Sequence, residues 1–140
     1  MKKKLKRILL IDDELLTLKI NAKIIEKLDI VEEIIPMQEA KMALQYLQTR
    51  LPDGKYPAPE MIFLDINMPG MNGWEFLTAY QKLATDQLAT HILMMLTSSP
   101  NPDDMMKTKD FNMINGYMEK PLTTDKMKSI LSRHFPERIK

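Results

Sequence analysis

The chain has 140 residues, and its 20 Lys and Arg against 19 Asp and Glu give a formal charge of +1. This length suits one domain with an ordinary core, and 44% hydrophobic with 28% charged residues excludes wholesale disorder. The near-neutral charge argues against a dedicated nucleic-acid binder. The sequence has no Cys, which excludes disulfides, thiolate metal sites and thiol nucleophiles, and we expect a cytoplasmic location.

The basic N-terminus does not have the pattern of a targeting signal. Only the apolar run Ile8–Ile11 separates it from Asp12. A secretory signal needs about 7–15 apolar residues, and a membrane span needs about 18. We therefore interpret residues 1–5 as a solvated basic tail and expect no membrane partner.

Short apolar runs alternate with segments of helical spacing along the chain. The runs are typical of strands buried on both faces, and they occupy 8–11, about 31–35, 61–64, 92–96 and about 114–118. The helical segments have apolar residues three or four apart within 15–28, 40–51, 76–83 and 127–135. Residues 102–111 give the weakest helical pattern. The alternation predicts an α/β fold of five βα units with a parallel sheet.

Polar signals mark several boundaries between these elements. Asp103 or Asp104 is a candidate start of the fourth helix, and Thr123–Asp125 can cap the fifth. Residues 51–59 contain three prolines and an Asp-Gly turn signal, which indicates a long surface loop.

Four of the five predicted strands end in polar residues. Asp12-Asp13, Asp65, Thr97-Ser98 and Lys120 follow the first, third, fourth and fifth runs. In open α/β sheets, ligands bind beyond the carboxyl ends of the strands. Carboxylates without His or Cys suit Mg²⁺, whereas a hydroxyl and an ammonium suit an anion. This combination stabilises a phosphoryl group in transfer, and Asp65 is the natural nucleophile for an aspartyl phosphate.

Each of these residues also has a purely structural interpretation. Asp13 alone could cap the first helix, and Asp65 alone could be a turn residue. Residues 65–70 faintly echo a calcium loop, but Pro69 takes a ligand position and Phe76 stands where a Glu is required. We interpret His91 and His134 as structural. For Met105 and Met106, a core position and a partner surface are equally open.

Four motifs in order resemble the receiver domain of two-component response regulators: Ile11–Glu14, Leu64–Gly73, Thr97-Ser98 and Tyr117–Pro121. The resemblance runs from about Lys6 to His134. It implies a flavodoxin-like (βα)5 fold with strand order 2-1-3-4-5. It also implies one receiver domain over residues 1–140, with a core of about 6–134, of the single-domain type similar to the chemotaxis regulator.

The resemblance also implies a role for each motif residue. Asp65 would accept a phosphoryl group from a histidine kinase or phosphotransfer protein. Mg²⁺ would be held by Asp12, Asp13, Asp65 and the backbone carbonyl of Asn67. Thr97, the backbone amide of Ser98 and Lys120 would contact the phosphoryl group. Tyr117 would act with Thr97 as the switch, and the Lys120-Pro121 bond would be cis.

The function implied is a phosphorylation-activated switch that catalyses only its own phosphorylation and dephosphorylation. It would signal through the face formed by the fourth helix, fifth strand and fifth helix, with a homodimer left open and no direct binding of nucleic acid. An aspartyl-phosphate phosphatase or phosphotransferase is one alternative, but Asp12 and Asp13 are adjacent rather than spaced as Asp-x-Asp. The other alternative is a non-phosphorylated pseudo-receiver adaptor, against which the complete residue set argues.

Overall fold

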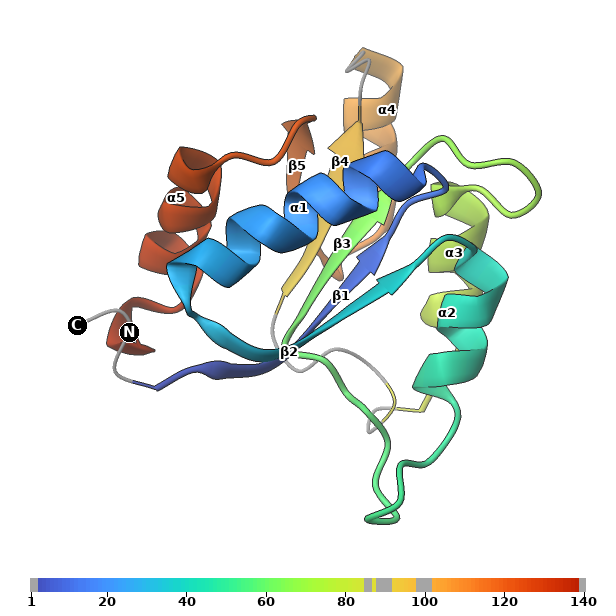
Figure 1. Cartoon of the computed structure of the whole chain (residues 1–140). Helices are drawn as coiled ribbons and strands as arrows, with labels where there is room; N and C mark the ends of the chain where they lie inside the picture. Colours follow the sequence, from blue (N-terminus) through green and yellow to red (C-terminus); the bar gives the residue numbers. More distant parts are fainter. Residues whose placement is uncertain (1–2, 85–86, 88–91, 98–101, 139–140) are drawn as a thin grey trace.

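A parallel five-stranded sheet in the order β2-β1-β3-β4-β5 forms the centre of the computed structural model, which describes residues 3–84, 87, 92–97 and 102–138 (Figure 1). The strands are β1 Leu5–Ile11, β2 Val31–Met37, β3 Met61–Asp65, β4 Ile92–Thr97 and β5 Ile114–Glu119. The helices are α1 Leu15–Leu28, α2 Ala40–Leu47, α3 Gly73–Tyr80, α4 Pro102–Lys107 and α5 Thr124–His134. The predicted flavodoxin-like architecture and strand order are therefore confirmed.

The central strands β1 and β3 are buried on both faces. Residues 8–11 and 61–64 are each no more than 2% exposed. Burying one such side chain contributes roughly 1.5–3 kcal/mol. The parallel register pairs Ile11 with Leu64, and Asp65 with Leu96. The carboxyl ends of β1, β3 and β4 consequently meet at one edge of the sheet.

Helices cover both faces of the sheet and form two apolar cores. Leu18 and Ile25 of α1 pack with Met127 and Ile130 of α5 on one face. On the other face, residues of α2 and α3 pack together, including Leu47 and the stacked rings of Phe76 and Tyr80. This two-sided covering explains why the strands read as continuous apolar runs.

Several element boundaries differ from the sequence-based prediction. β2 continues to Met37, whereas α2 ends at Leu47 and α3 at Tyr80. Leu51 and Leu83 were expected on these helices but follow them. Pro52 disfavours helical backbone at the residue before it, which explains why Leu51 is outside α2. Leu15 was expected in the apolar stripe of its helix but is 50% exposed.

The fourth helix is shorter than the predicted segment 102–111. α4 ends at Lys107 and a 3₁₀ turn, Thr108–Asp110, follows it. The prediction that Asp103 or Asp104 starts the helix was wrong, because both lie in its first turn after Pro102. Proline suits the first helical position and acidic side chains suit the first turn. The helix buries none of its side chains.

Other local predictions are confirmed. The Thr123 side chain accepts a hydrogen bond from Lys126 N–H at 3.1 Å and caps α5. The 51–59 segment is an irregular loop in which Gly54 has a φ of 85°, a conformation that glycine adopts readily. The Lys120-Pro121 peptide is cis. Among the helices in the described ranges, none combines the length and apolar character needed to cross a membrane.

Candidate functional site

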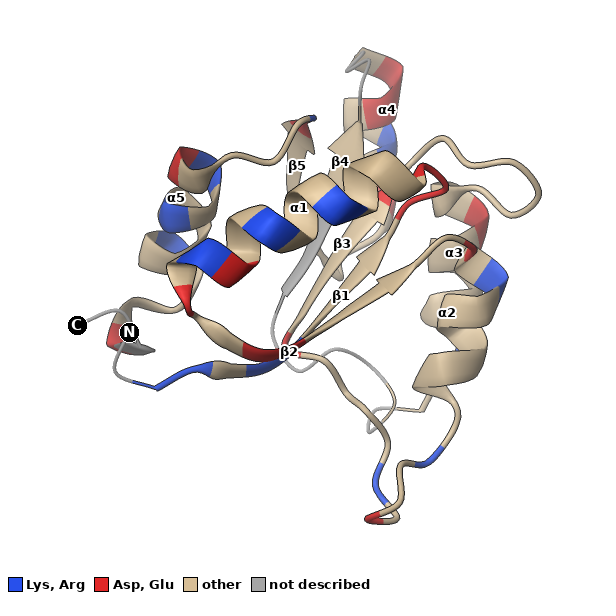
Figure 2. Cartoon of the chain, in the orientation of Figure 1, with Lys and Arg blue, Asp and Glu red and all other residues tan. Residues whose placement is uncertain are grey.

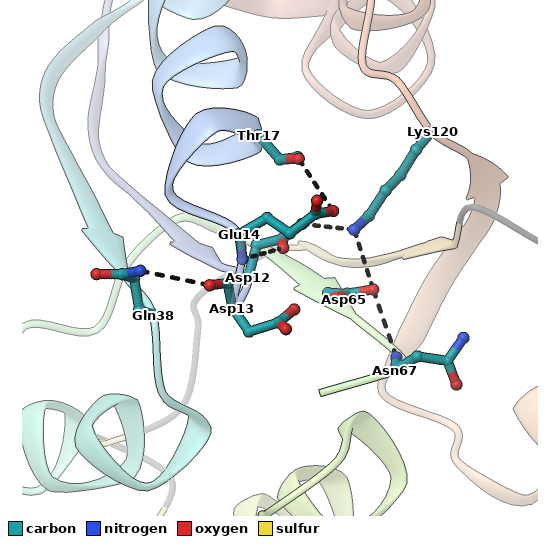
Figure 3. Close-up of polar contacts among 8 residues, drawn as sticks. All are labelled: Asp12, Asp13, Glu14, Thr17, Gln38, Asp65, Asn67 and Lys120. Atoms are coloured by element: carbon teal, nitrogen blue, oxygen red, sulfur yellow. Dashed lines mark hydrogen bonds and ion pairs between the residues drawn. The ribbon is translucent and has the colours of Figure 1, made fainter. Parts of the chain in front are cut away.

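Three carboxylates meet at the carboxyl edge of the sheet (Figure 3). Asp12 and Asp13 directly follow β1, and Asp65 is the last residue of β3. One oxygen from each of the three lies within 4.8 Å of the others. Asp12 and Asp65 are only 3% and 4% exposed. Like charges this close and this poorly solvated repel one another, so the cluster needs a compensating cation.

Lys120 supplies one positive charge to this cluster. Its Nζ lies 2.6 Å from Asp12 Oδ2 and 3.1 Å from Asp65 Oδ1. Its backbone N–H donates to the carbonyl of Thr97 at 2.7 Å, which joins the ends of β4 and β5. The Lys126 ammonium donates to the carbonyls of Glu119 at 2.6 Å and Pro121 at 3.0 Å. Lys126 therefore fixes the backbone on both sides of Lys120, a role that no sequence motif indicated.

Backbone groups orient the carboxylates further. Asp12 Oδ1 accepts from Glu14 N–H at 2.9 Å, and Asp65 Oδ1 accepts from Asn67 N–H at 3.4 Å. The Gln38 amide donates to the carbonyl of Asp13 at 3.3 Å, so the end of β2 also contributes to the site. Glu14, not Asp13, occupies the cap position of α1. The Asp13 carboxylate makes no hydrogen bond with any described residue and is available as a ligand.

The electrostatic environment perturbs two groups. Burial, together with the charge of Asp12, raises the pKa of Asp65 to about 6, although Lys120 and the Asn67 amide act in the opposite direction. Burial acts to lower the pKa of Lys120, but its hydrogen bonds and ion pairs with Asp12 and Asp65 outweigh burial and raise it. Lys120 thus stays charged, whereas Asp65 holds its negative charge at a cost in free energy.

The donor set fits a hard divalent cation. Three carboxylate oxygens within 4.8 Å of one another, without His or Cys, are the ligands that Mg²⁺ takes in proteins. A cation there would offset the two effects that raise the pKa of Asp65, which are burial first and the charge of Asp12 second. Asp12, Asp13 and Asp65 would hold it.

Gly73 brings the start of α3 against the end of β3. A Cβ at this position would lie 2.8 Å from the carbonyl oxygen of Asp65 and 2.8 Å from the Cα of Ile66. The Gly73 N–H donates to the carbonyl of Ile66 at 2.8 Å. Only glycine permits this approach, because any larger residue would have to displace backbone.

Comparison with known proteins agrees with this geometry. The family model described as the response regulator receiver domain matches residues 8–132. The chain belongs to this receiver family.

Two curated relatives and two solved structures illustrate the similarity. The probable methanogenesis regulatory protein FilR2 of Methanothrix harundinacea is 28% identical over 86% of the present chain and 76% of its own length. The response regulator Rcp1 of Synechocystis is 27% identical over 82% of the present chain and 76% of its own length. The crystal structure of a two-component response regulator from Cytophaga hutchinsonii has 30% identity and a TM-score of 0.82. The match covers 94% of the present chain and 97% of the Cytophaga chain. The crystal structure of a Mn²⁺-bound form of Rcp1 superposes with a TM-score of 0.72 at 26% identity. The match covers 91% of the present chain and 92% of the Rcp1 chain.

The other residues singled out from the sequence lie on β4, β5 and α5, where the structure describes them. Thr97 is fully buried at the end of β4. Tyr117 lies on β5, and its hydroxyl is buried without a hydrogen bond to any described residue. Ser98 and His91 fall outside the described residues. His134 lies at the end of α5, beside Arg133 in a hollow of 190 Å³.

Proposed function

We propose that this receiver is a phosphorylation-activated response regulator whose phosphoacceptor is Asp65. The observation that carries the proposal is the convergence of Asp12, Asp13 and Lys120 on a buried Asp65 at one sheet edge. Phosphoryl transfer needs a nucleophile and opposite charge around the moving group more than it needs covalent chemistry from the protein.

In the proposed reaction, a phosphohistidine of a histidine kinase or phosphotransfer protein is the donor. The phosphorus–nitrogen bond breaks, the imidazole keeps the electron pair, and a carboxylate oxygen of Asp65 forms the new bond to phosphorus. Lys120 then pairs with the phosphoryl oxygens, and Thr97 with the Ser98 amide donates hydrogen bonds to them. Mg²⁺, when bound, would be held by the three carboxylates and the Asn67 carbonyl and would neutralise part of the negative charge.

An exposed apolar surface on α1, beside the acid cluster, offers the phosphodonor protein a place to dock. Leu16, Leu15 and Ile20 of α1 are 70%, 50% and 44% exposed, and α1 begins two residues after Asp13. Figure 2 shows lysines and one glutamate along the same helix, α1. This surface suits an amphipathic helix of the donor, because exposed apolar groups flanked by charge are typical of recognition sites.

In this proposal, a downstream protein binds to the output surface, the face formed by α4, β5 and α5. Met105 and Met106 of α4 are 55% and 65% exposed, which supports a partner surface rather than a core position. Tyr117 lines two hollows along β5, of 190 Å³ and 360 Å³. A change in the position of Tyr117 would alter the shape of both hollows. Such a change would couple the switch to a protein that binds at this face. We place the protein in the cytoplasm, in keeping with its lack of Cys.

Intact mass after incubation with acetyl phosphate tests the proposal. We expect a gain of one phosphoryl group with Mg²⁺, no gain with chelator, no gain in Asp65→Asn, and slow loss on standing. Glu32→Gln is the matched control, because it removes one exposed negative charge far from the site in sequence. No gain in the wild type under any condition would instead favour the pseudo-receiver adaptor. Steady turnover of a phosphomonoester would favour the phosphatase.

A further inference from the structure

Trp74 lies between the loop that follows Asp65 and the end of α4. It is the single Trp of the sequence and the second residue of α3. Its ring stacks on Phe111 with a centroid distance of 5.9 Å and an interplanar angle of 26°. From the last residue of α4, the Lys107 ammonium lies 5.5 Å from the centroid of the same ring. One half-buried side chain thus contacts both the end of α4 and the segment leading to β5.

On its other side, Trp74 is joined to the phosphoacceptor by backbone. Gly73 packs directly on Asp65 and Ile66, with no room for a Cβ, and its N–H donates to the Ile66 carbonyl. The Asn72 side chain and Glu75 close a capping box around the same turn. A shift of the backbone at Asp65 is therefore transmitted to residue 74, because close-packed groups without free space move together.

The end of α4 is held by the Thr108 hydroxyl, which donates to the Met105 carbonyl at 2.6 Å, and by the contact of Lys107 with the Trp74 ring. The helix buries none of its side chains, and Met105 and Met106 are exposed. Stacking on Phe111 and the cation–π contact with Lys107 are the ring contacts made across to α3. Trp74 therefore contacts both the last residue of α4 and Phe111, which precedes β5.

We propose that Trp74 is a positioning residue that couples the state of Asp65 to α4, by a route separate from Thr97 and Tyr117. The inference rests on the proposed phosphorylation of Asp65. Phosphorylation biases the loop between Asp65 and Gly73, and the Trp74–Phe111 stack carries that bias to the output surface.

The single Trp permits a direct spectroscopic test. In protein incubated with Mg²⁺ and acetyl phosphate, Trp emission should change in proportion to the phosphorylated fraction measured by intact mass. Asp65→Asn should show no change. Full phosphorylation with unchanged emission would overturn the coupling.

Hydrogen exchange at the amides of residues 102–110 tests the consequence. In Trp74→Leu, the exchange response of these amides to phosphorylation should fall roughly 2- to 30-fold, while the phosphorylated fraction stays at the wild-type level. Trp74→Phe should keep most of the response, because it can still stack. Phe111→Leu should lose as much as Trp74→Leu, and the double variant should lose no more. Gln81→Ala, at an exposed position directly after the same helix, is the matched control.

The outcomes separate the coupling from the function on which it rests. A merely structural role would lower the stability of Trp74→Leu but leave its response to phosphorylation intact, which would overturn the inference. Absence of a mass gain in the wild type would overturn the proposed function itself.

Discussion

Replacing Asp65 by asparagine should stabilise the metal-free protein at neutral pH. Burial and the neighbouring Asp12 raise the pKa of Asp65 to about 6, against an ordinary value of 3.8. The folded chain therefore binds a proton more tightly than the unfolded chain. Between about pH 4 and pH 6 the free energy of unfolding should fall as pH rises, because the folded state loses its extra proton over this range.

The size of the effect follows from the same values. The difference between about 6 and 3.8 corresponds to about 3 kcal/mol of unfavourable free energy when the carboxylate is charged. Asparagine removes that charge and can still accept a hydrogen bond from Lys120. We expect a gain of about 1–3 kcal/mol at pH 7.5, equivalent to about 4–10 °C in Tm, and no gain at pH 3.

Urea unfolding in chelator, measured from pH 3 to pH 8, checks this prediction. Added Mg²⁺ should narrow the gap between the two proteins, because only the wild type keeps all three carboxylates. Glu32→Gln, which neutralises an exposed strand residue, should change stability little at any pH. An Asp65→Asn variant no more stable than the wild type at pH 7.5, or a difference that does not vary with pH, would refute the reasoning.

Three further predictions concern the same edge of the sheet. Mg²⁺ at ten times its Kd should add about 1.4 kcal/mol to the stability of the wild type, and Asp12→Asn should lose this gain; equal thermal shifts in the two proteins would count against the metal site. Gly73→Ala should cost about 1–3 kcal/mol in urea unfolding, because its Cβ would lie 2.8 Å from backbone atoms of Asp65 and Ile66; a cost no larger than that of Thr78→Ala would contradict this. Asn72→Ala should cost about 1 kcal/mol by removing the acceptor that caps α3, and Asn72→Ser should restore most of it; identical urea midpoints for the two variants would argue against the cap.

The order of elements could be predicted because each type has its own hydrophobic period. Residues 8–11 of β1 and 61–64 of β3 are continuous apolar runs because both faces of the sheet are covered, and α1 occupies the predicted residues 15–28. α4 could not be predicted well, because a helix that buries no side chain leaves no apolar stripe in the sequence. Without an apolar stripe, the sequence pattern indicates Asp103 or Asp104 as the start of α4, whereas the helix begins at Pro102.

The sequence by itself determined which polar residues end the strands. Because parallel strands present their carboxyl ends at one edge, Asp12, Asp65 and Lys120 could be placed together from their order alone. Only the tertiary structure decided how they interact, since the raised pKa of Asp65 depends on burial and on distances that no spacing encodes. The same holds for Gly73, which needs a close approach of backbone, and for the stack of Trp74 on Phe111, which joins residues far apart in the chain. It also holds for Lys126, whose contacts with the Glu119 and Pro121 carbonyls depend on the folded path of the chain around Lys120. Contacts of this kind come from packing, and packing is a property of the folded whole.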